Sequence, residues 1–351
     1  MSHPHLGRSL LASLAALLCL VLIAPATAAL APARAAAPVK IKVALDWYPN
    51  ANHAGLFLAQ ERGYFTQAGL DVDFYTPADP TTVLQTVGAG KDDFGISYQT
   101  DVLLAREQGL PVVSVAALVQ HPLLCIMATM DQHITRPRDL VGKTVGYPGI
   151  PSQEAFLATM LESDGASLDD VNLVNVGFDL VPAAISGRVN AVMGAYWTHE
   201  TILAAREGHP VDVLRVEDWG VPDYYELVLV ASEKTVRDRP EVVTAFLGAM
   251  QRGYQDAIAD QSAALDALQK NYPDMDRDVE TQGLALLAPE WTDHVPAFGT
   301  QTAERWDAFG DWMKHHDLIS DDLDISAAYT TTLLPALAAT PAATPAATPA
   351  G

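Results

Sequence analysis

Short apolar runs alternate with amphipathic segments in the first third of the chain. The runs predict strands at residues 41–45, 72–75, 94–97 and 112–118. The amphipathic segments predict helices at about residues 53–62, 80–89 and 100–108. Glycines stand where these helices should end, as C-cap glycines do. Strands that alternate with helices of this length indicate βαβ units and a largely parallel sheet.

The same alternation starts again near residue 143. It predicts strands at 143–147, 171–176, 191–195, 211–216 and 225–231. Helices are predicted at 152–161, 181–186 and 199–206, and Ser152 is the predicted N-cap of the first of them. The last region predicts helices at about 239–258, 261–271, 276–287 and 302–315. Because that region has no sheet of its own, we expect it to pack back on the first sheet.

Two segments, residues 90–98 and 187–196, resemble each other. Each begins with glycine and a cation, contains an acid or an amide, and continues as a strand that ends in tyrosine. A helix and a Gly-x-Pro-Val sequence follow both. The repeat predicts two similar lobes, with Tyr98 and Tyr196 at the carboxyl ends of matching strands. Chance similarity between two βαβ units is the alternative.

We therefore predict an α/β fold of two lobes, each a mainly parallel sheet flanked by helices. The chain should cross between the lobes near residues 120–127 and 221–230, and two such crossovers make a hinge that lets a cleft close on a ligand. The predicted boundaries are 38–122 plus 228–335 for lobe 1 and 123–227 for lobe 2.

The N-terminal sequence predicts export, and the C-terminal sequence predicts a disordered tail. Residues 1–37 carry early basic side chains, an apolar run at 10–23 and then small residues, as a signal peptide does. An uncleaved anchor is the alternative, but the run is short for a span that needs about 20 residues. Residues 336–351 repeat Ala-Ala-Thr-Pro, and we expect a disordered extended tail there. The mature chain would face the periplasm or the outer surface of the membrane.

Composition excludes several classes of function. The net charge is −22, so the chain lacks the basic surface with which proteins neutralise nucleic acid, and an anionic membrane would repel it. Cys125 is the only cysteine after residue 37, so no internal disulfide and no cysteine metal site can form. It is predicted to be a buried small hydrophobe. We expect no metal, no cofactor and a monomer.

Aromatic, amide and carboxylate side chains gather in five loops that follow predicted strands. In an open α/β sheet, ligands bind where loops leave the carboxyl ends of strands. The loops are 46–53, 97–101, 147–153, 196–200 and 223–226, and none of them contains Arg or Lys. The predicted ligand-binding residues are Trp47, Asn50, His53, Tyr98, Tyr147, Tyr196, Trp197, Glu200, Tyr225 and Glu226.

Each of these residues also has a structural interpretation. Trp47 could simply pack at a strand end, and His53 could simply begin a helix. Tyr196 and Trp197 are adjacent, so we expect only one of them to reach the ligand. Of the residues at 224–226, we expect about half to face the cleft.

The absence of basic residues from the five loops discriminates among ligands. Sulfonate, phosphate and carboxylate groups usually recruit Arg, although a helix N-terminus alone can hold an anion. Aromatic rings favour a flat ligand, and carboxylates and amides favour a ligand with N–H donors. The sequence therefore predicts a neutral or weakly cationic, aminated heteroaromatic ligand.

Several segments resemble the NMT1/THI5-like family of solute-binding proteins. They are 46–53, 55–59, 63–65, 69–72, 142–147 and 191–195, and the resemblance spans about residues 40–320. It implies a two-lobed, type II-like periplasmic-binding-protein fold and delivery of a small molecule to an ABC permease in the membrane. Some members bind a thiamine-precursor aminopyrimidine such as formylaminopyrimidine or hydroxymethylpyrimidine, and a related branch binds riboflavin.

One branch of the family consists of thiamine-pyrimidine synthases, which are enzymes. The resemblance implies for them a lysine that carries pyridoxal phosphate, a histidine that is consumed and a cysteine-rich iron motif. Aligned on residues 93–95, their lysine falls at Ser97 and their histidine at Asp101. Their cysteine cluster falls at 221–225, which holds no cysteine. A Schiff base needs an amine, so we predict that this chain is not an enzyme.

Overall fold

The computed structural model describes residues 37–336, and from Pro38 onward they form one compact unit. The predicted signal peptide at 1–37 and the predicted tail at 336–351 lie outside this range, apart from one residue each. Between residues 37 and 336, no helix combines the length and the apolar character that a bilayer crossing requires.

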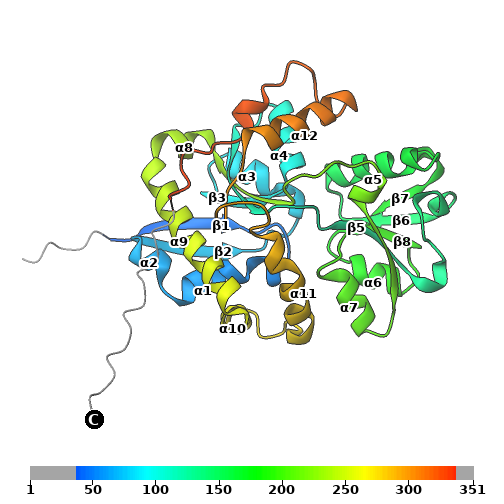
Figure 1. Cartoon of the computed structure of the whole chain (residues 1–351), viewed down its shortest axis with the longest axis horizontal. Coiled ribbons are helices and arrows are strands. Elements are labelled where there is room, and N and C mark those ends of the chain that lie inside the picture. The colour runs from blue at the N-terminus through cyan, green and yellow to red at the C-terminus, as the bar shows by residue number, and fades with distance from the viewer. Residues whose placement is uncertain (1–36, 337–351) are drawn as a thin grey trace, which may run out of the picture. The chain divides into compact units, whose positions relative to one another are not determined.

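The first sheet has five strands in the order β2-β1-β3-β10-β4 (Figure 1). The strands are β1 (Val39–Ala44), β2 (Leu70–Tyr75), β3 (Phe94–Ser97), β4 (Val112–Val119) and β10 (Leu227–Ser232). β1 pairs in parallel with β2 and β3, whereas β10 pairs antiparallel with β3 and β4. The sheet is thus mainly parallel, as predicted, with one strand reversed.

The second sheet repeats this plan in the order β7-β6-β8-β5-β9. Its strands are β5 (Leu124–Thr129), β6 (Thr144–Tyr147), β7 (Asn172–Asn175), β8 (Ala191–Tyr196) and β9 (Val211–Arg215). β5 pairs antiparallel with β8 and β9, and β6 pairs in parallel with β7 and β8. In each sheet the reversed strand is the one that the chain forms directly after it crosses from the other lobe.

Helices flank both sheets, as Figure 1 shows. Those of the first lobe are α1 (Ala54–Glu61), α2 (Tyr64–Gln67), α3 (Val83–Gly88), α4 (Gln99–Glu107), α8 (Glu233–Asp238), α9 (Pro240–Ala259), α10 (Gln261–Asn271), α11 (Arg277–Glu290) and α12 (Ala303–His315). Those of the second lobe are α5 (Pro151–Ser163), α6 (Leu180–Ile185) and α7 (Glu200–Arg206). The 3-10 helices are η1 (Ala51–His53), η2 (Pro80–Thr82), η3 (Met130–Gln132), η4 (Pro137–Leu140), η5 (Leu168–Asp170), η6 (Val216–Trp219) and η7 (Ile325–Ala328).

Three local predictions were wrong or incomplete. β5 was read only as a crossover, because its first five residues are apolar without alternation and all six are buried. Helices α2 and α8 were missed. Ser152 is not an N-cap, because α5 begins one residue earlier at Pro151, after Ile150. The predicted lobe boundaries remain a prediction, since strand pairing does not fix them to a residue.

The C-terminal helices pack back on the first lobe, as predicted. Phe246 of α9 stacks on Phe94 of β3 with ring centroids 4.5 Å apart. α9 also lies directly against α1, because Gly253 has no side chain. A Cβ atom at Gly253 would lie 2.2 Å from the carbonyl oxygen of Gly55. Glycine is therefore required at this helix crossing.

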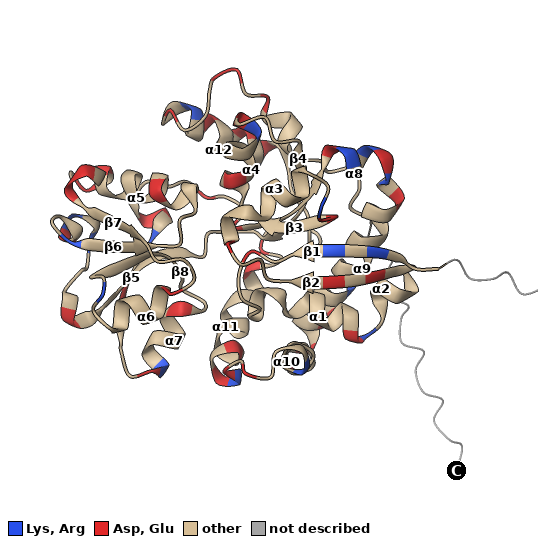
Figure 2. Ribbon diagram, turned by 180° about the vertical axis from the view of Figure 1, so that it is seen from behind, with Lys and Arg blue, Asp and Glu red and all other residues tan. Residues whose placement is uncertain are grey.

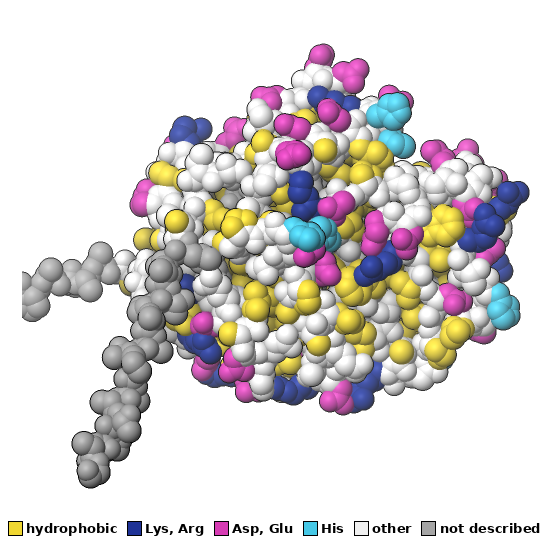
Figure 3. All heavy atoms as spheres, in the orientation of Figure 1, with side chains coloured by type: hydrophobic (Ala, Val, Ile, Leu, Met, Phe, Trp, Pro, Cys, Tyr) yellow, Lys and Arg dark blue, Asp and Glu magenta, His cyan; other side chains and the backbone are white. Residues whose placement is uncertain are grey.

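Charged side chains are mixed over the surface. Figure 2 shows basic positions on β1 beside acidic positions on β2, and the register pairs Lys40 with Asp71 and Lys42 with Asp73. Opposite charges directly across two strands favour this register. Figure 3 shows acidic and basic side chains interspersed on the visible face rather than gathered in one basic patch.

Candidate functional site

Asp46, the first residue of the loop after β1, is the centre of one buried group of polar side chains. His53 donates from Nε2 to Asp46 Oδ1 at 3.0 Å, and the hydroxyl of Tyr98 donates to Oδ2 at 3.3 Å. His53 Nδ1 accepts the backbone N–H of Asn50 at 3.2 Å, which assigns the ring proton to Nε2. Asp46 is thus held in place by the residues that follow it.

Asn50 and His53 were predicted to contact ligand, but the structure gives both of them partners within the protein. The Oδ1 atom of Asn50 accepts from the backbone N–H and the side-chain amide of Asn52, both at 2.9 Å, and so caps η1. Both ring nitrogens of His53 are occupied, and its side chain is fully buried. The Oδ1 atom of Asn50 and both ring nitrogens of His53 are thus used within the protein, and contact of either residue with ligand stays a prediction.

Glu226 is the centre of a second buried group, where the two crossovers meet. Its Oε2 atom accepts the backbone N–H groups of Leu123 and Leu124, at 2.7 and 3.1 Å, and the hydroxyl of Tyr224, at 2.9 Å. Its Oε1 atom accepts the hydroxyl of Tyr196 at 3.1 Å. Burial raises the pKa of the Glu226 carboxyl to about 7, although its four donors oppose that rise.

Each acidic group accepts a hydrogen bond from a tyrosine at the end of a strand: Asp46 from Tyr98, and Glu226 from Tyr196. Burial, assisted by the charge of Asp46, raises the pKa of the Tyr98 phenol well above its usual value. Burial and the charge of Glu226 do the same for Tyr196. Both phenols therefore keep their protons at neutral pH and remain hydrogen-bond donors. Their rings come from matching positions at the ends of β3 and β8, as the sequence repeat predicted.

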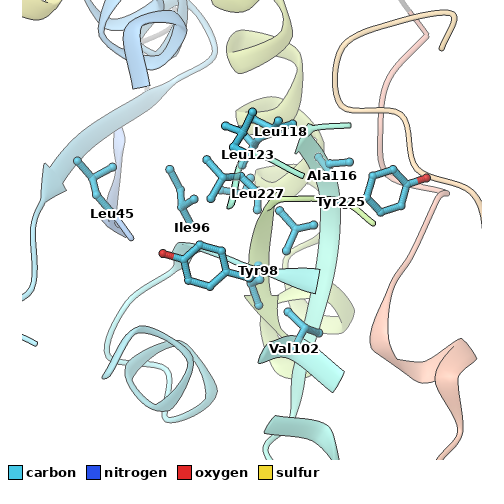
Figure 4. Close-up of a cluster of buried hydrophobic side chains, with 14 of the residues drawn as sticks. Leu45, Ile96, Tyr98, Val102, Ala116, Leu118, Leu123, Tyr225 and Leu227 are labelled. Atoms are coloured by element: carbon cyan, nitrogen blue, oxygen red, sulfur yellow. The ribbon is translucent and has the colours of Figure 1, made fainter. Parts of the chain in front are cut away.

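Tyr225, which precedes β10, faces away from Glu226. Its hydroxyl accepts the backbone N–H of Thr302 at 3.0 Å, and the guanidinium of Arg305 lies 4.2 Å from its ring centre. Figure 4 shows the hydroxyls of Tyr98 and Tyr225 pointing away from each other. Tyr224, and not Tyr225, reaches Glu226, because adjacent side chains of an extended segment face opposite ways.

Tyr196 and Trp197 also have different partners, as their adjacency predicted. Tyr196 points to Glu226, whereas Trp197 donates from Nε1 to the carbonyl oxygen of Pro122 at 3.2 Å. The guanidinium of Arg215 lies 4.0 Å from the Trp197 ring centre. Glu200 is buried and accepts the backbone N–H of Tyr196 at 2.8 Å, so it fixes the end of β8.

The remaining predicted aromatic residues lie nearer the surface. The partly buried Trp47 packs edge-to-face on Phe178 of the second lobe, with ring centroids 4.6 Å apart. The same Phe178 ring contacts the exposed Tyr48. Tyr147, at the end of β6, is partly buried, and burial with the nearby Glu154 charge raises its pKa. Trp47 therefore joins the two lobes.

A cavity of about 90 Å³ adjoins Tyr98. Residues of both lobes line it, among them Tyr98, Asp101, Ile150 and Pro151, and no Lys or Arg is one of its lining residues. Asp101 accepts the hydroxyl of Ser152 at 2.7 Å. Burial raises the pKa of the Asp101 carboxyl to about 6. The cavity thus places one aromatic ring, that of Tyr98, beside a buried acid.

Sequence reasoning missed three residues of this region. Asp46, Asp101 and Tyr224 were each inside a predicted loop but were not selected. The available signal was the position of Asp46 directly after the predicted strand 41–45 and of Asp101 in the first turn of the helix that follows β3. Asp46, Asp101 and Glu226 thus supply three buried carboxyl groups, which suit a ligand that offers N–H donors.

A family model described as NMT1/THI5 like matches residues 50–264. The chain belongs to the NMT1/THI5-like family. This NMT1/THI5-like protein is 40% identical over 296 residues to the formylaminopyrimidine-binding protein of Halalkalibacterium halodurans, covering 83% of this chain and 89% of that protein. It is 28% identical over 326 residues to the riboflavin-binding protein RibY of Chloroflexus aurantiacus, covering 89% and 92%.

The NMT1/THI5-like chain also matches an enzyme and a solved binding protein. It is 27% identical over 304 residues to the 4-amino-5-hydroxymethyl-2-methylpyrimidine phosphate synthase of Legionella pneumophila, covering 84% and 92%. The alkanesulfonate-binding protein SsuA of Xanthomonas axonopodis pv. citri, bound to MOPS, superposes with a TM-score of 0.66 at 17% identity, covering 84% and 99%. That likeness shows the fold, which is the two-lobed periplasmic-binding-protein fold predicted above.

Proposed function

We propose that this protein is the extracytoplasmic solute-binding component of an ABC importer and that it binds a neutral thiamine-precursor aminopyrimidine of the formylaminopyrimidine or hydroxymethylpyrimidine type. It acts as a monomer that presents its ligand-bound form to a membrane permease. The formylaminopyrimidine-binding relative, at 40% identity over most of both chains, supports this proposal.

The observation that carries the proposal is the cluster of buried acids and phenols, whose hydrogen-bond partners include His53 but no Lys or Arg of the described chain. The carboxylates of Asp46, Asp101 and Glu226 are acceptors, which match the ring-bound N–H groups of an aminopyrimidine. Hydrogen bonds to charged groups contribute about 1.5–3 kcal/mol each. The rings of Tyr98 and Tyr196 supply flat apolar contact, worth about 0.5–1.5 kcal/mol beyond area burial. A sulfonate or phosphate would meet only like charge there.

Riboflavin is the second candidate, because one relative carries that name. We rank riboflavin second because that relative is 28% identical to this chain, whereas the formylaminopyrimidine-binding relative is 40% identical. If the ligand is an aminopyrimidine, the protein should bind aminopyrimidines more tightly than riboflavin. If the ligand is riboflavin, the order should be reversed.

Synthase activity is disfavoured by the residues at the aligned positions. Ser97 and Asp101 are both buried, and neither supplies the amine that a Schiff base with pyridoxal phosphate requires. Incubation with pyridoxal phosphate and iron should therefore give neither an aldimine absorbance nor a pyrimidine product. Either signal would overturn the proposal that this chain binds without catalysing.

A thermal-shift panel tests the proposed ligand class. The purified mature protein is melted with formylaminopyrimidine, hydroxymethylpyrimidine, thiamine, riboflavin or taurine. A ligand at about 100 times its Kd stabilises the folded state by about 2.7 kcal/mol, so a true ligand raises the melting temperature clearly. We expect a shift with the aminopyrimidines. A shift with taurine alone would refute the ligand class.

A matched pair of variants ties the shift to the site. Asp46→Asn removes a buried acceptor charge and should weaken the aminopyrimidine about tenfold, as loss of one charged hydrogen bond implies. Asp260→Asn makes the same chemical change at an exposed residue that caps α10 within the first lobe. The second variant should bind like the wild type.

A further inference from the structure

Helix α5 begins without a cap from its own segment. Its first residue is Pro151, and the preceding Ile150 has no side-chain atom that could accept a hydrogen bond. The first turn of any α-helix leaves N–H groups without partners inside the helix, and its N-terminus attracts negative charge. An acceptor from elsewhere is therefore needed at this end of α5.

Asp101 of α4 supplies that acceptor from the other lobe. Its Oδ2 atom accepts the Ser152 hydroxyl at 2.7 Å, and its carboxyl also faces the backbone N–H of Ser152. Asp101 is only 8% exposed, and it lines the cavity together with Ile150 and Pro151. A carboxylate that belongs to the protein thus occupies the helix end that faces the candidate ligand site.

We propose that Asp101 is a specificity-determining residue that keeps anionic ligands out of this cleft. The inference rests on the proposed function, because it assigns a selective role within the same ligand site. A helix N-terminus with free N–H groups binds sulfate, phosphate or carboxylate readily. With Asp101 in that place, an entering anion meets a like charge at the N-terminus of α5.

The fold itself does not impose this selectivity. An alkanesulfonate-binding protein has the same fold and holds a sulfonate buffer. The proposed selectivity therefore rests on side chains, and Asp101 is an acid of α4 that contacts the first turn of α5.

The test compares anion binding by the wild type, Asp101→Ala, Asp101→Asn and the control Asp260→Asn. Sulfate and ethanesulfonate are titrated by isothermal calorimetry at pH 7.5 and constant ionic strength. Asp101→Ala should bind at least one of these anions about fivefold or more tightly than the wild type does, which corresponds to one charge at a helix end. Asp260→Asn should bind anions like the wild type.

Two results would overturn the inference: equal anion affinity in all four proteins, or a wild type that already binds these anions as tightly as Asp101→Ala. If Asp101→Ala fails to fold, Asp101→Asn decides, because it keeps the size of the side chain and removes only the charge. A formylaminopyrimidine titration of the wild type is run separately. Its failure would reject the proposed function, while the anion series still decides the role of Asp101.

Discussion

The sharpest prediction concerns Glu226, because this one side chain accepts hydrogen bonds from residues of both crossovers. Glu226→Gln keeps its shape and lets the amide oxygen accept from the Leu123 and Leu124 N–H groups and from the Tyr224 hydroxyl. The amide nitrogen can donate to the hydroxyl oxygen of Tyr196. The substitution therefore removes a buried ionisable group while its surroundings stay paired.

The magnitude follows from the raised pKa. Burial moves the Glu226 pKa from 4.5 to about 7 in the folded protein. Between these values the folded state holds a proton that the unfolded state has released, so the free energy of unfolding falls as the pH rises. At about 1.4 kcal/mol for each pKa unit, the wild type should lose about 3 kcal/mol through this group as the pH rises from below 4.5 to above 7.

Urea unfolding at pH 5, 6, 7 and 8 measures this difference. The free energy of unfolding of Glu226→Gln should fall less between pH 5 and pH 8 than that of the wild type. Glu241→Gln alters an exposed glutamate at the start of α9 and should follow the wild type. Parallel pH profiles for the wild type and Glu226→Gln would refute the assignment of a raised pKa to this buried carboxyl.

Three further predictions concern packing and the contact between lobes. Trp47→Ala removes the ring that packs on Phe178. Calorimetry should find that the affinity for an aminopyrimidine is weakened by up to about tenfold, which is the contribution of one aromatic pair. Unchanged affinity would contradict a role for Trp47 in closure of the cleft. Gly253→Ala should cost about 1–3 kcal/mol of overpacking and melt several degrees below the control Gly248→Ala; equal melting temperatures would disprove the close helix contact. Arg206→Gln breaks exposed ion pairs to the start of α11 and should change stability by less than about 1 kcal/mol in urea unfolding. A larger loss would contradict the small contribution expected of exposed ion pairs.

The alternation of apolar runs and helices was enough to predict the two sheets and most of their strands. β3 begins and ends at the predicted residues, and β8 extends the prediction by one residue. β5 was not predicted, since a fully buried strand shows no alternation of polar and apolar positions. Ser152 was misread because α5 begins one residue earlier, at Pro151. Its hydroxyl donates to Asp101, a contact between residues 51 apart that no local pattern reveals.

The loops of the site were predictable, but the direction of each side chain was not. Sequence alone could not choose between Tyr224 and Tyr225, because a phase error of one residue exchanges the two faces of an extended segment. Asn50 and His53 have side chains of the kind that contact ligands. In the tight turn at η1, however, both side chains accept backbone N–H groups of their own loop. Polar residues in such turns bond their own backbone first.

A crystal structure of the protein with formylaminopyrimidine tests the central claim most directly. The account predicts that the pyrimidine ring contacts Tyr98 and Tyr196 and that its N–H groups lie within hydrogen-bond distance of the Asp46 or Glu226 carboxylate, with no Arg or Lys on the ring. A ligand bound away from these acids, or held by a basic side chain, would contradict it.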